Sequence, residues 1–377
     1  MNICVVTFYG NNYGACLQAY ATQQYLTQQG HHCDILRYEN RFTRNKYNAL
    51  FNKLKALVRF KKYMAERKLV HANWSKIQER NNCFEQFREK YLQLTDQEYV
   101  YGSGDTTIFD NYDVIICGSD QIWNPTLYDR CHPVYYLSVV PDDKKKISLS
   151  SSIGVSQLKE KYHEQFRTYL ARFHAISVRE YEGSQLVKEI ARCNAQWTLD
   201  PTLLLTAQEW LKLPSRYIIK KNYVFCYMFN NFPYIQEIKQ WIHDHLRLEI
   251  VSFPFVGREM GSLDTQIYDA SPVDFVHIIK NSKFVLTDSF HATAFSINLN
   301  VPFFSIERQN PSFSGNMNSR IYSILKMTSL EDRIINASNY KTKLEKINID
   351  YVIANRVINE KRNETKRFLQ NAIEMKE

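Results

Sequence analysis

A histidine at the predicted start of a helix is the first candidate for chemistry in this sequence. Residues 283–287 (KFVLT) form a β-branched and aromatic run that predicts a buried strand, and an apolar helical pattern begins after Asp288 and Ser289. Helix N-terminal amides attract anions, and ligands of open α/β sheets bind beyond the carboxyl ends of the strands. Ser289 and His291 are therefore expected where an anionic ligand is held. The alternative is that Asp288 or Ser289 only caps the helix and that His291 only bonds to a neighbouring loop.

Polar clusters recur after other predicted strands. Residues 112–117 are followed by 118–125 (GSDQIWNP), where several polar groups and an indole favour a binding site over a simple turn. The strand at 146–151 ends in small residues, the strand at 175–178 leads into an arginine, and residues 198–204 form a further strand end. Because parallel strands present their carboxyl ends at one edge, these clusters are expected to converge.

The first predicted strand, residues 2–8, opens onto a loop with two glycines and two asparagines, followed by a helix to about Gln29. These residue types tolerate left-handed backbone and close approach of a ligand. The loop has neither the GxGxxG spacing of a dinucleotide site nor the Gly-Lys-Ser/Thr of a P-loop. A second strand at 33–38 completes a βαβ unit, which predicts a parallel sheet.

The alternation of strands and helices predicts an α/β fold in two halves. The first, residues 1–214, carries a helical insertion at about 41–95, including a helical segment around 74–91. The second half spans 215–340, and residues 341–377 supply a C-terminal helix without a sheet of its own, which is expected to pack back across one of the halves. At 377 residues the chain is too long for a single ordinary core.

The composition, with 44% apolar and 14% aromatic residues, is that of a soluble globular protein. The sequence shows no signal-peptide pattern and no apolar run long enough to cross a bilayer, so a cytoplasmic location is expected. Eight scattered cysteines without metal-ligand spacing predict reduced, buried thiols and no metal site.

The net charge of +9 is concentrated in residues 41–68, which hold ten Lys or Arg against the single acidic Glu66. Within this segment, the apolar and basic residues of 47–63 fall on opposite faces of a predicted amphipathic helix. Such a helix is expected either to contact an anionic membrane surface or to be a solvated helix packed on the protein. Nucleic acid is not an expected partner, because no recognition motif accompanies the charge.

Six motifs occur in an order that resembles the polysaccharide pyruvyltransferase family, over roughly residues 2–335. They are the loop at 12–20 (NYGACLQAY), 118–125 (GSDQIWNP), 177–180 (SVRE), 199–202 (LDPT), 287–292 (TDSFHA) and 318–321 (NSRI). The resemblance implies a GT-B-like fold, with two Rossmann-like domains facing across a cleft. It also implies that the enolpyruvyl group of phosphoenolpyruvate becomes a cyclic ketal on two sugar hydroxyls, with release of phosphate and no cofactor. Many family members carry an arginine two positions before the histidine; here that position is Ser289, so the anion-binding arginine must come from elsewhere.

The resemblance and the chemistry together assign site residues. A carboxylate and a phosphate call for planar guanidinium donors, and ketal formation calls for proton transfer, for which His291 is the leading candidate. Asp120 or Asp288 is expected either to orient the histidine or to deprotonate the acceptor, or only to cap a loop. The predicted catalytic residues are His291, Arg179, Asp120 and Asp288. The predicted donor-binding residues are Arg179, Ser289, His291, Arg308, Asn318, Ser319, Arg320 and Ser152. The predicted acceptor-binding residues are Asn12, Tyr13, Gly14, Gln18, Ser119, Asp120, Gln121 and Trp123.

The expected acceptor is a hexose such as galactose in a surface polysaccharide repeat unit, free or linked to a polyprenyl diphosphate. A lipid-linked acceptor would give the basic segment 47–63 a role at the inner face of the cell membrane. Two other functions remain open because fold does not fix function: a glycosyltransferase that uses a nucleotide sugar, and a non-catalytic saccharide-binding protein.

Overall fold

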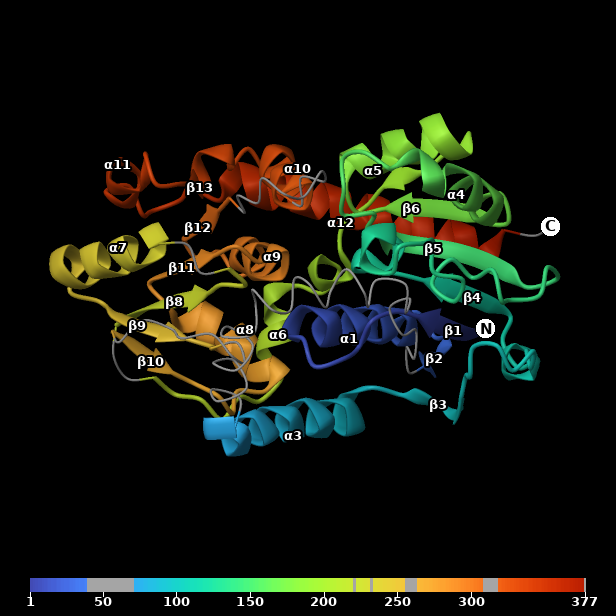
Figure 1. Ribbon diagram of the computed structural model, residues 1–377, viewed down its shortest axis with the longest axis horizontal. Coiled ribbons are helices and arrows are strands. Elements are labelled where there is room, and N and C mark those ends of the chain that lie inside the picture. The colour runs from blue at the N-terminus through green and yellow to red at the C-terminus, as the bar shows by residue number, and fades with distance from the viewer. Residues whose placement is uncertain (39–70, 220–221, 231–232, 255–262, 308–317, 376–377) are drawn as a thin grey trace, which may run out of the picture.

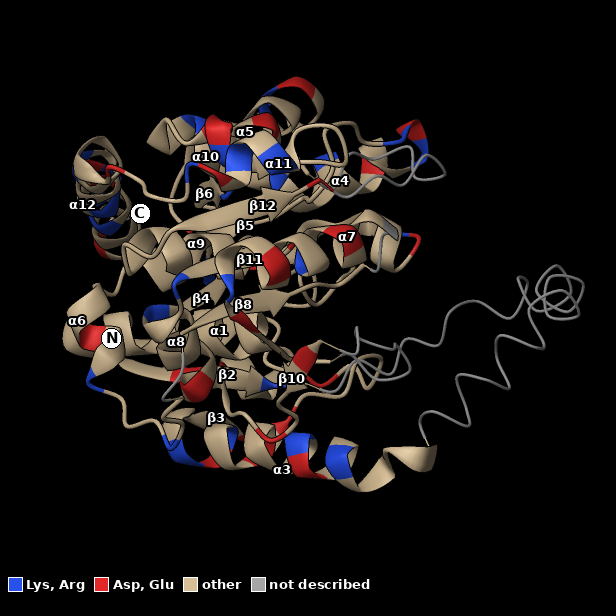
Figure 2. Ribbon diagram, turned by 90° about the vertical axis from the view of Figure 1, so that its left-hand side faces the viewer, with Lys and Arg blue, Asp and Glu red and all other residues tan. Residues whose placement is uncertain are grey.

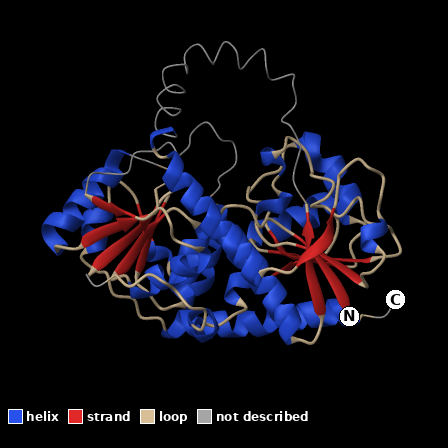
Figure 3. Cartoon of the chain, turned by 90° about the horizontal axis from the view of Figure 1, so that it is seen from below, coloured by secondary structure: helices blue, strands red, loops and turns tan. Residues whose placement is uncertain are grey.

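The chain folds around two parallel sheets, one in each half (Figure 1; Figure 3). The computed structural model describes residues 1–38, 71–219, 222–230, 233–254, 263–307 and 318–375. The first sheet has the strand order β3-β2-β1-β4-β5-β6-β7 and the second β10-β9-β8-β11-β12-β13. In each sheet the second and third strands in sequence lie on one side of the first strand (β1 or β8), and the later strands lie on its other side, as in Rossmann sheets. This confirms the α/β fold with two Rossmann-like halves, and the boundary predicted at 214/215 falls between the sheets.

The strands of the first sheet are β1 (Asn2–Val6), β2 (His32–Arg37), β3 (Leu94–Glu98), β4 (Val114–Cys117), β5 (Lys145–Ser151), β6 (Ala175–Val178) and β7 (Gln196–Trp197). Those of the second are β8 (Tyr223–Tyr227), β9 (Glu249–Ser252), β10 (Asp264–Gln266), β11 (Phe284–Thr287), β12 (Phe303–Ile306) and β13 (Ile334–Ile335). The described helices are α1 (Tyr13–Gln28), α3 (Trp74–Tyr91), α4 (His163–Leu170), α5 (Tyr181–Leu186), α6 (Ala207–Leu211), α7 (Pro233–Trp241), α8 (Pro272–Asn281), α9 (Phe290–Asn298), α10 (Ser319–Thr328), α11 (Tyr340–Leu344) and α12 (Val352–Glu374).

Parallel pairing in register brings the strand ends to a common edge. Val6 at the end of β1 pairs with Cys117 at the end of β4, which pairs in turn with Ser148 of β5. The central strands are apolar and buried on both faces, as expected where helices cover both sides of a parallel sheet. The loops that leave β1, β4, β5 and β6 therefore start close together.

Tyr13, in the first turn of α1, locks the two halves together. Its ring stacks on Phe275 of α8 with centroids 5.1 Å apart and also packs against Phe253 and Phe84. Its hydroxyl donates to the carbonyl oxygen of Ala270 at 3.1 Å. A side chain of the first half thus lies inside the aromatic core of the second half, next to the loop that carries Gly14.

The C-terminal helix α12 packs back on the sheets but contacts both halves, where one was expected (Figure 1). Arg362 donates from Nε to the carbonyl oxygen of Leu203 in the first half, at 2.6 Å, and from Nη2 to Oδ1 of Asn298 in α9, at 3.3 Å. Thr365 accepts from the backbone amide of Leu199 at 3.0 Å. The helix therefore braces the segment that leads from the first sheet toward the second.

The described part of the predicted helical insertion holds a helix and the start of a strand. Helix α3 covers residues 74–91 as expected, but residues 94–98 form the edge strand β3, paired in parallel with β2. Basic and acidic side chains are mixed along α3 (Figure 2). The basic segment 47–63 lies outside the described residues. In the part of the chain that the structure describes, no helix is long and apolar enough to cross a membrane.

The environment of Tyr13 generates a stability prediction. Tyr13→Ala is expected to lower the free energy of unfolding by about 3–5 kcal/mol, because a large buried aromatic side chain is removed. Tyr13→Phe keeps the ring and loses one hydrogen bond, which costs about 1 kcal/mol. Urea unfolding followed by circular dichroism measures both, and equal losses in the two variants would contradict the packing role of the ring.

Candidate active site

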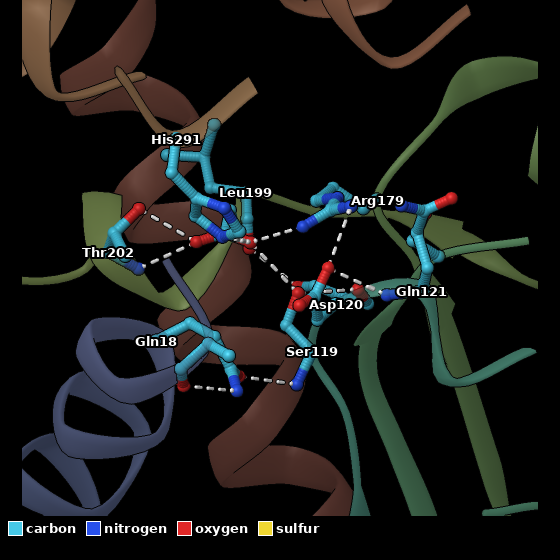
Figure 4. A network of polar contacts seen from close by, with 12 residues as sticks. Gln18, Ser119, Asp120, Gln121, Arg179, Leu199, Thr202 and His291 are labelled. Atoms are coloured by element: carbon cyan, nitrogen blue, oxygen red, sulfur yellow. Dashed lines mark hydrogen bonds and ion pairs between the residues drawn. The ribbon is translucent and has the colours of Figure 1, made fainter. Parts of the chain in front are cut away.

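The buried carboxylate of Asp200 is the centre of a polar network at the carboxyl edge of the first sheet (Figure 4). Its Oδ2 accepts from Ser119 Oγ and from Arg179 Nη1, each at 2.9 Å. Its Oδ1 accepts from the backbone amide and the hydroxyl of Thr202, at 3.0 and 2.7 Å. The last two bonds cap the 3₁₀ turn Pro201–Leu203, so local chain geometry holds the carboxylate in place.

His291 reaches the same carboxylate from the second half. It lies in the first turn of α9, and its Nε2 is 3.7 Å from Asp200 Oδ2, which is an ion-pair distance too long for a hydrogen bond. Burial alone would raise the pKa of Asp200, but His291 and Arg179 hold that pKa far below its ordinary value. Asp200 is therefore ionised beside the imidazole. His291 Nε2 is buried and makes no hydrogen bond within the described residues.

Gly14 sets the position of the imidazole from the opposite side. A Cβ built on Gly14 would lie 2.7 Å from Cε1 of His291 and closer still to Nδ1 and Cγ. Any side chain at residue 14 would therefore displace the ring. Asn12 starts the helix that carries Gly14, because its Oδ1 accepts from the amide of Ala15 at 3.1 Å. The glycine loop of the first half thus meets the histidine of the second half by direct contact.

Arg179 is a buried cation among three carboxylates. In addition to its bond with Asp200, its Nε lies 3.5 Å from Glu180 Oε1 and its Nη2 lies 3.8 Å from Asp120 Oδ1. Burial alone would lower the pKa of Arg179, but the three carboxylates raise it. Its Cζ lies 4.2 Å from the ring centroid of Phe290, a cation–π contact with the second half. Within the described residues, the buried Nε and Nη2 donate no hydrogen bond, and the two longer ion pairs with Glu180 and Asp120 are their contacts.

Asp120 has a backbone conformation that side chains rarely adopt, with φ 62° and ψ −178°. Its Oδ1 accepts from the amide of Gln121 at 2.8 Å, and its carbonyl oxygen accepts from the amide of Ser152 at 2.9 Å. Strained backbone of this kind is concentrated at functional sites because surrounding contacts must hold it. Asp120 combines the loop-capping role that was one expectation with a position facing Arg179.

Several predicted acceptor residues instead hold the loops. Gln18 is buried: its Nε2 donates to Thr7 Oγ1 and to the Phe8 carbonyl oxygen, both at 2.8 Å, while its Oε1 accepts from the amide of Ser119. Ser119 is fully buried and donates to Ser150 O as well as to Asp200. Both residues fix the relative positions of the β1 and β4 loops, and neither presents a polar group to a ligand.

Two of the predicted acceptor-binding residues, Trp123 and Tyr13, lie in the core instead of facing a sugar. Trp123 is 0% exposed, stacks on Tyr136 with centroids 5.2 Å apart, and donates from Nε1 to the Tyr135 carbonyl oxygen. Tyr13 is 3% exposed and lies in the aromatic core of the second half. Each ring is core because packing partners cover both of its faces.

Asp288 does not orient the histidine. It is fully buried and accepts from the amide of Phe229 at 2.7 Å and from the amide and side chain of Asn230, so it anchors the loop after β8. Asp200 instead faces His291. Ser289 is the N-cap of α9, with its Oγ accepting from the amide of Ala292 at 3.4 Å, which bears out the simpler alternative for this residue.

The remaining predicted residues lie around the same edge. Ser152, after β5, donates from its hydroxyl to Glu180. Asn318, Ser319 and Arg320 are buried at the start of α10, and Arg320 acts electrostatically on Glu180. Gln121 accepts from the side chain of Asn124 at 3.0 Å. Arg308 lies outside the described residues.

Three residues of the network were missed by sequence reasoning: Asp200, Glu180 and Phe290. Asp200 had a usable signal, because it directly follows a predicted strand and precedes Pro201 and Thr202, the same pattern that drew attention to the other strand ends. Within the described residues, no cluster of His, Cys, Asp or Glu has the arrangement of a metal site.

Solved structures with a similar fold bind nucleotide sugars, as their descriptions state. The UDP-GlcNAc 2-epimerase from Neisseria meningitidis bound to UDP-GlcNAc matches with a TM-score of 0.53 and 9% identity, over 98% of this chain and 100% of that chain. The UDP-GlcNAc 2-epimerase from Methanocaldococcus jannaschii in complex with UDP-GlcNAc and UDP has a TM-score of 0.52 and 11% identity, over 98% of both chains. Arabidopsis thaliana UGT89C1 complexed with UDP-L-rhamnose has a TM-score of 0.50 and 8% identity, over 99% of this chain and 98% of that chain. At such identities these similarities show the fold alone, which is GT-B.

The sequence itself is more specific about the family. No curated protein matches the chain. The sequence model of a family described as polysaccharide pyruvyl transferase matches residues 12–310, a range that holds Gly14, Arg179, Asp200 and His291. The match extends from β2 to β12, and so over most of both sheets and over the contact of Gly14 with His291. The chain therefore belongs to the polysaccharide pyruvyl transferase family.

Proposed function

We propose that this protein transfers the enolpyruvyl group of phosphoenolpyruvate to two hydroxyls of one sugar, forming a cyclic pyruvate ketal and releasing phosphate. The observation that carries the proposal is the meeting of Arg179 and His291, from different halves, on the carboxylate of Asp200. This arrangement brings a cation for an anionic donor and an imidazole that can transfer protons to the same carboxylate. Membership of the polysaccharide pyruvyl transferase family supports the same reaction class.

The proposed reaction balances without an oxidant or a cofactor. A proton adds to the methylene carbon of the donor, which becomes a methyl group, and the first sugar hydroxyl bonds to the adjacent carbon. The carbon–oxygen bond to phosphate then breaks, and the second hydroxyl bonds to the same carbon. The two hydroxyls lose two protons: one balances the new methyl hydrogen and the other leaves with phosphate.

His291 is the proposed proton donor to the methylene carbon. Protonation of this carbon creates a cationic neighbour, so the donor must be charged and must be held in place. The ionised Asp200 supports the imidazolium, and Gly14 leaves room for the ring on its other side. The first hydroxyl then returns its proton to His291.

Arg179 and Arg320 are the proposed anion-binding residues. Planar guanidinium groups bind carboxylate and phosphate through paired hydrogen bonds. Asp200 already occupies Nη1 of Arg179, which leaves Nε and Nη2 for the donor. Arg320 lies at the N-terminus of α10, where helix amides also favour an anion. Together they take the place of the family arginine that is Ser289 here.

The proposed acceptor is a hexose such as galactose in a surface polysaccharide repeat unit, of the kind that builds a capsule or an exopolysaccharide. The loops that carry Asn12, Asp120 and Gln121 are the proposed acceptor side, because they border Arg179 and His291 from the first half. A polyprenyl-diphosphate-linked acceptor would place the reaction at the inner face of the cell membrane, with residues 47–63 at the lipid surface.

Product analysis tests the proposed function. The protein is incubated with phosphoenolpyruvate and a synthetic galactoside, and mass spectrometry is expected to detect the added pyruvyl group together with an equal amount of free phosphate. Isothermal titration is expected to show binding of phosphoenolpyruvate and none of UDP- or GDP-sugars. The reverse binding result would instead support a nucleotide-sugar glycosyltransferase in the same fold.

The pairing of His291 with Asp200 predicts coupled losses of activity. His291→Gln is expected to lower kcat by about 10²–10⁴-fold, because a positioned proton donor is removed. Asp200→Asn is expected to lower kcat as well, and the double variant should be little worse than His291→Gln alone, since both residues serve one proton transfer. Phosphate release measures the rates. Losses that multiply in the double variant would show that Asp200 acts independently of His291.

The contact of Gly14 with the imidazole predicts a steric effect on catalysis. Gly14→Ala is expected to lower kcat at least about 10-fold, because the added methyl group displaces the His291 ring from its position beside Asp200. Gly10→Ala is the matched control, since a Cβ there would meet nothing within 4 Å. Phosphate release and thermal unfolding are measured for both variants. An unchanged kcat in Gly14→Ala would show that the absence of a side chain at residue 14 is not needed for catalysis.

A further inference from the structure

Glu180 is a buried carboxyl group beside Arg179 whose described neighbours satisfy only one of its two oxygens. It is 2% exposed at the carboxyl end of β6, and although it precedes α5 its side chain makes no capping hydrogen bond to that helix. Its Oε1 accepts from the Ser152 hydroxyl and lies 3.5 Å from Arg179 Nε. Its Oε2 is buried without a hydrogen-bond partner among the described residues. A buried, unbonded carboxyl oxygen is costly, so its presence beside the site calls for a reason.

The groups that face Glu180 come from three elements. Arg179 lies on β6, the Ser152 hydroxyl follows β5, and Arg320 approaches from α10 of the second half. Asp120 and Asp200 contact the same Arg179 through its Nη2 and Nη1, and His291 contacts Asp200. Burial raises the pKa of Glu180, and this effect outweighs the two guanidinium groups and the hydroxyl, which lower it. Glu180 therefore holds a proton more readily than an exposed glutamate does.

Glu180 is also under the influence of both guanidinium groups proposed to bind the donor: Arg179 contacts it at 3.5 Å, and Arg320 acts on it electrostatically. An anion bound by Arg179 and Arg320 brings negative charge next to the carboxylate and takes up part of the positive charge that kept it ionised. Both effects favour the protonated form of Glu180 once the donor is bound. His291, by contrast, contacts Asp200 on the other side of Arg179.

We propose that Glu180 is a second proton-transfer residue: it takes up a proton when phosphoenolpyruvate binds and delivers it to the oxygen of the departing phosphate. This inference rests on the proposed function and assigns the second of its two proton transfers. The carbon–oxygen bond to phosphate breaks as the Glu180 proton moves to that oxygen, and the second sugar hydroxyl returns a proton to Glu180 as it bonds to the same carbon. His291 and Glu180 both end the cycle as they began it.

Proton uptake on donor binding tests the inference without an acceptor. Phosphoenolpyruvate is titrated into wild-type protein by calorimetry in buffers of different ionisation enthalpy, over a series of pH values. Wild type is expected to take up more protons per bound donor than Glu180→Gln, by up to one proton, and its donor affinity should fall more steeply as pH rises. Glu189→Gln, an exposed charge change in the turn that continues α5, is the matched control and should behave as wild type.

The outcomes separate this inference from the proposed function. Equal proton uptake by wild type and Glu180→Gln would overturn the role of Glu180 and leave the proposed function intact. Failure of wild type to bind phosphoenolpyruvate would overturn the proposed function and this inference with it. If Glu180→Gln does not fold, infrared difference spectra of wild type decide: donor binding must produce a new protonated-carboxyl band, and its absence overturns the inference. With a working acceptor, Glu180→Gln should lose on the order of 100-fold in kcat.

Discussion

A single ionised carboxylate, that of Asp200, is the interaction on which the arrangement of the site depends. A charge taken out of water is tolerated only when donors surround it, and Asp200 receives them from Ser119, Arg179 and Thr202. Those residues belong to the loops after β4, β6 and β7, which parallel pairing brings to one edge. His291 adds a fourth contact from the second half. Because the buried charge of Asp200 needs these donors, it fixes three loops of the first sheet relative to one another and to a helix of the second half.

Much of this arrangement follows from local patterns. Apolar runs that stop at polar clusters predicted the strand ends, and the geometry of parallel sheets explains why Ser119, Arg179 and Asp200 meet although they are far apart in the chain. Ser289 behaves as its residue type predicts, as a helix N-cap. The α/β halves and the returning C-terminal helix were also predictable, because their apolar periodicity is strong.

Other features depend on which way a side chain turns where the chain leaves a strand. Asp288 and Asp200 both follow strands, yet one bonds to a neighbouring loop and the other faces the site. Trp123 looked like a ligand platform because it follows a polar cluster, but Tyr136 covers its face. The edge strand β3 was missed because its sequence, LTDQE, has little apolar character and owes its strand conformation to pairing with β2.

The path of α12 limits how the two halves of proteins with this fold can be recombined into chimeras. The helix follows the second sheet in sequence, yet Lys145 at the start of β5 donates to the carbonyl oxygen of Ile373 near its end, and Thr365 accepts from Leu199. The first half is therefore completed by a helix that follows the second half in the sequence. A chimera that takes its first half from one protein and everything after it from another would pair that first half with the α12 of the other protein. A viable chimera must therefore take α12 from the protein that supplies the N-terminal half.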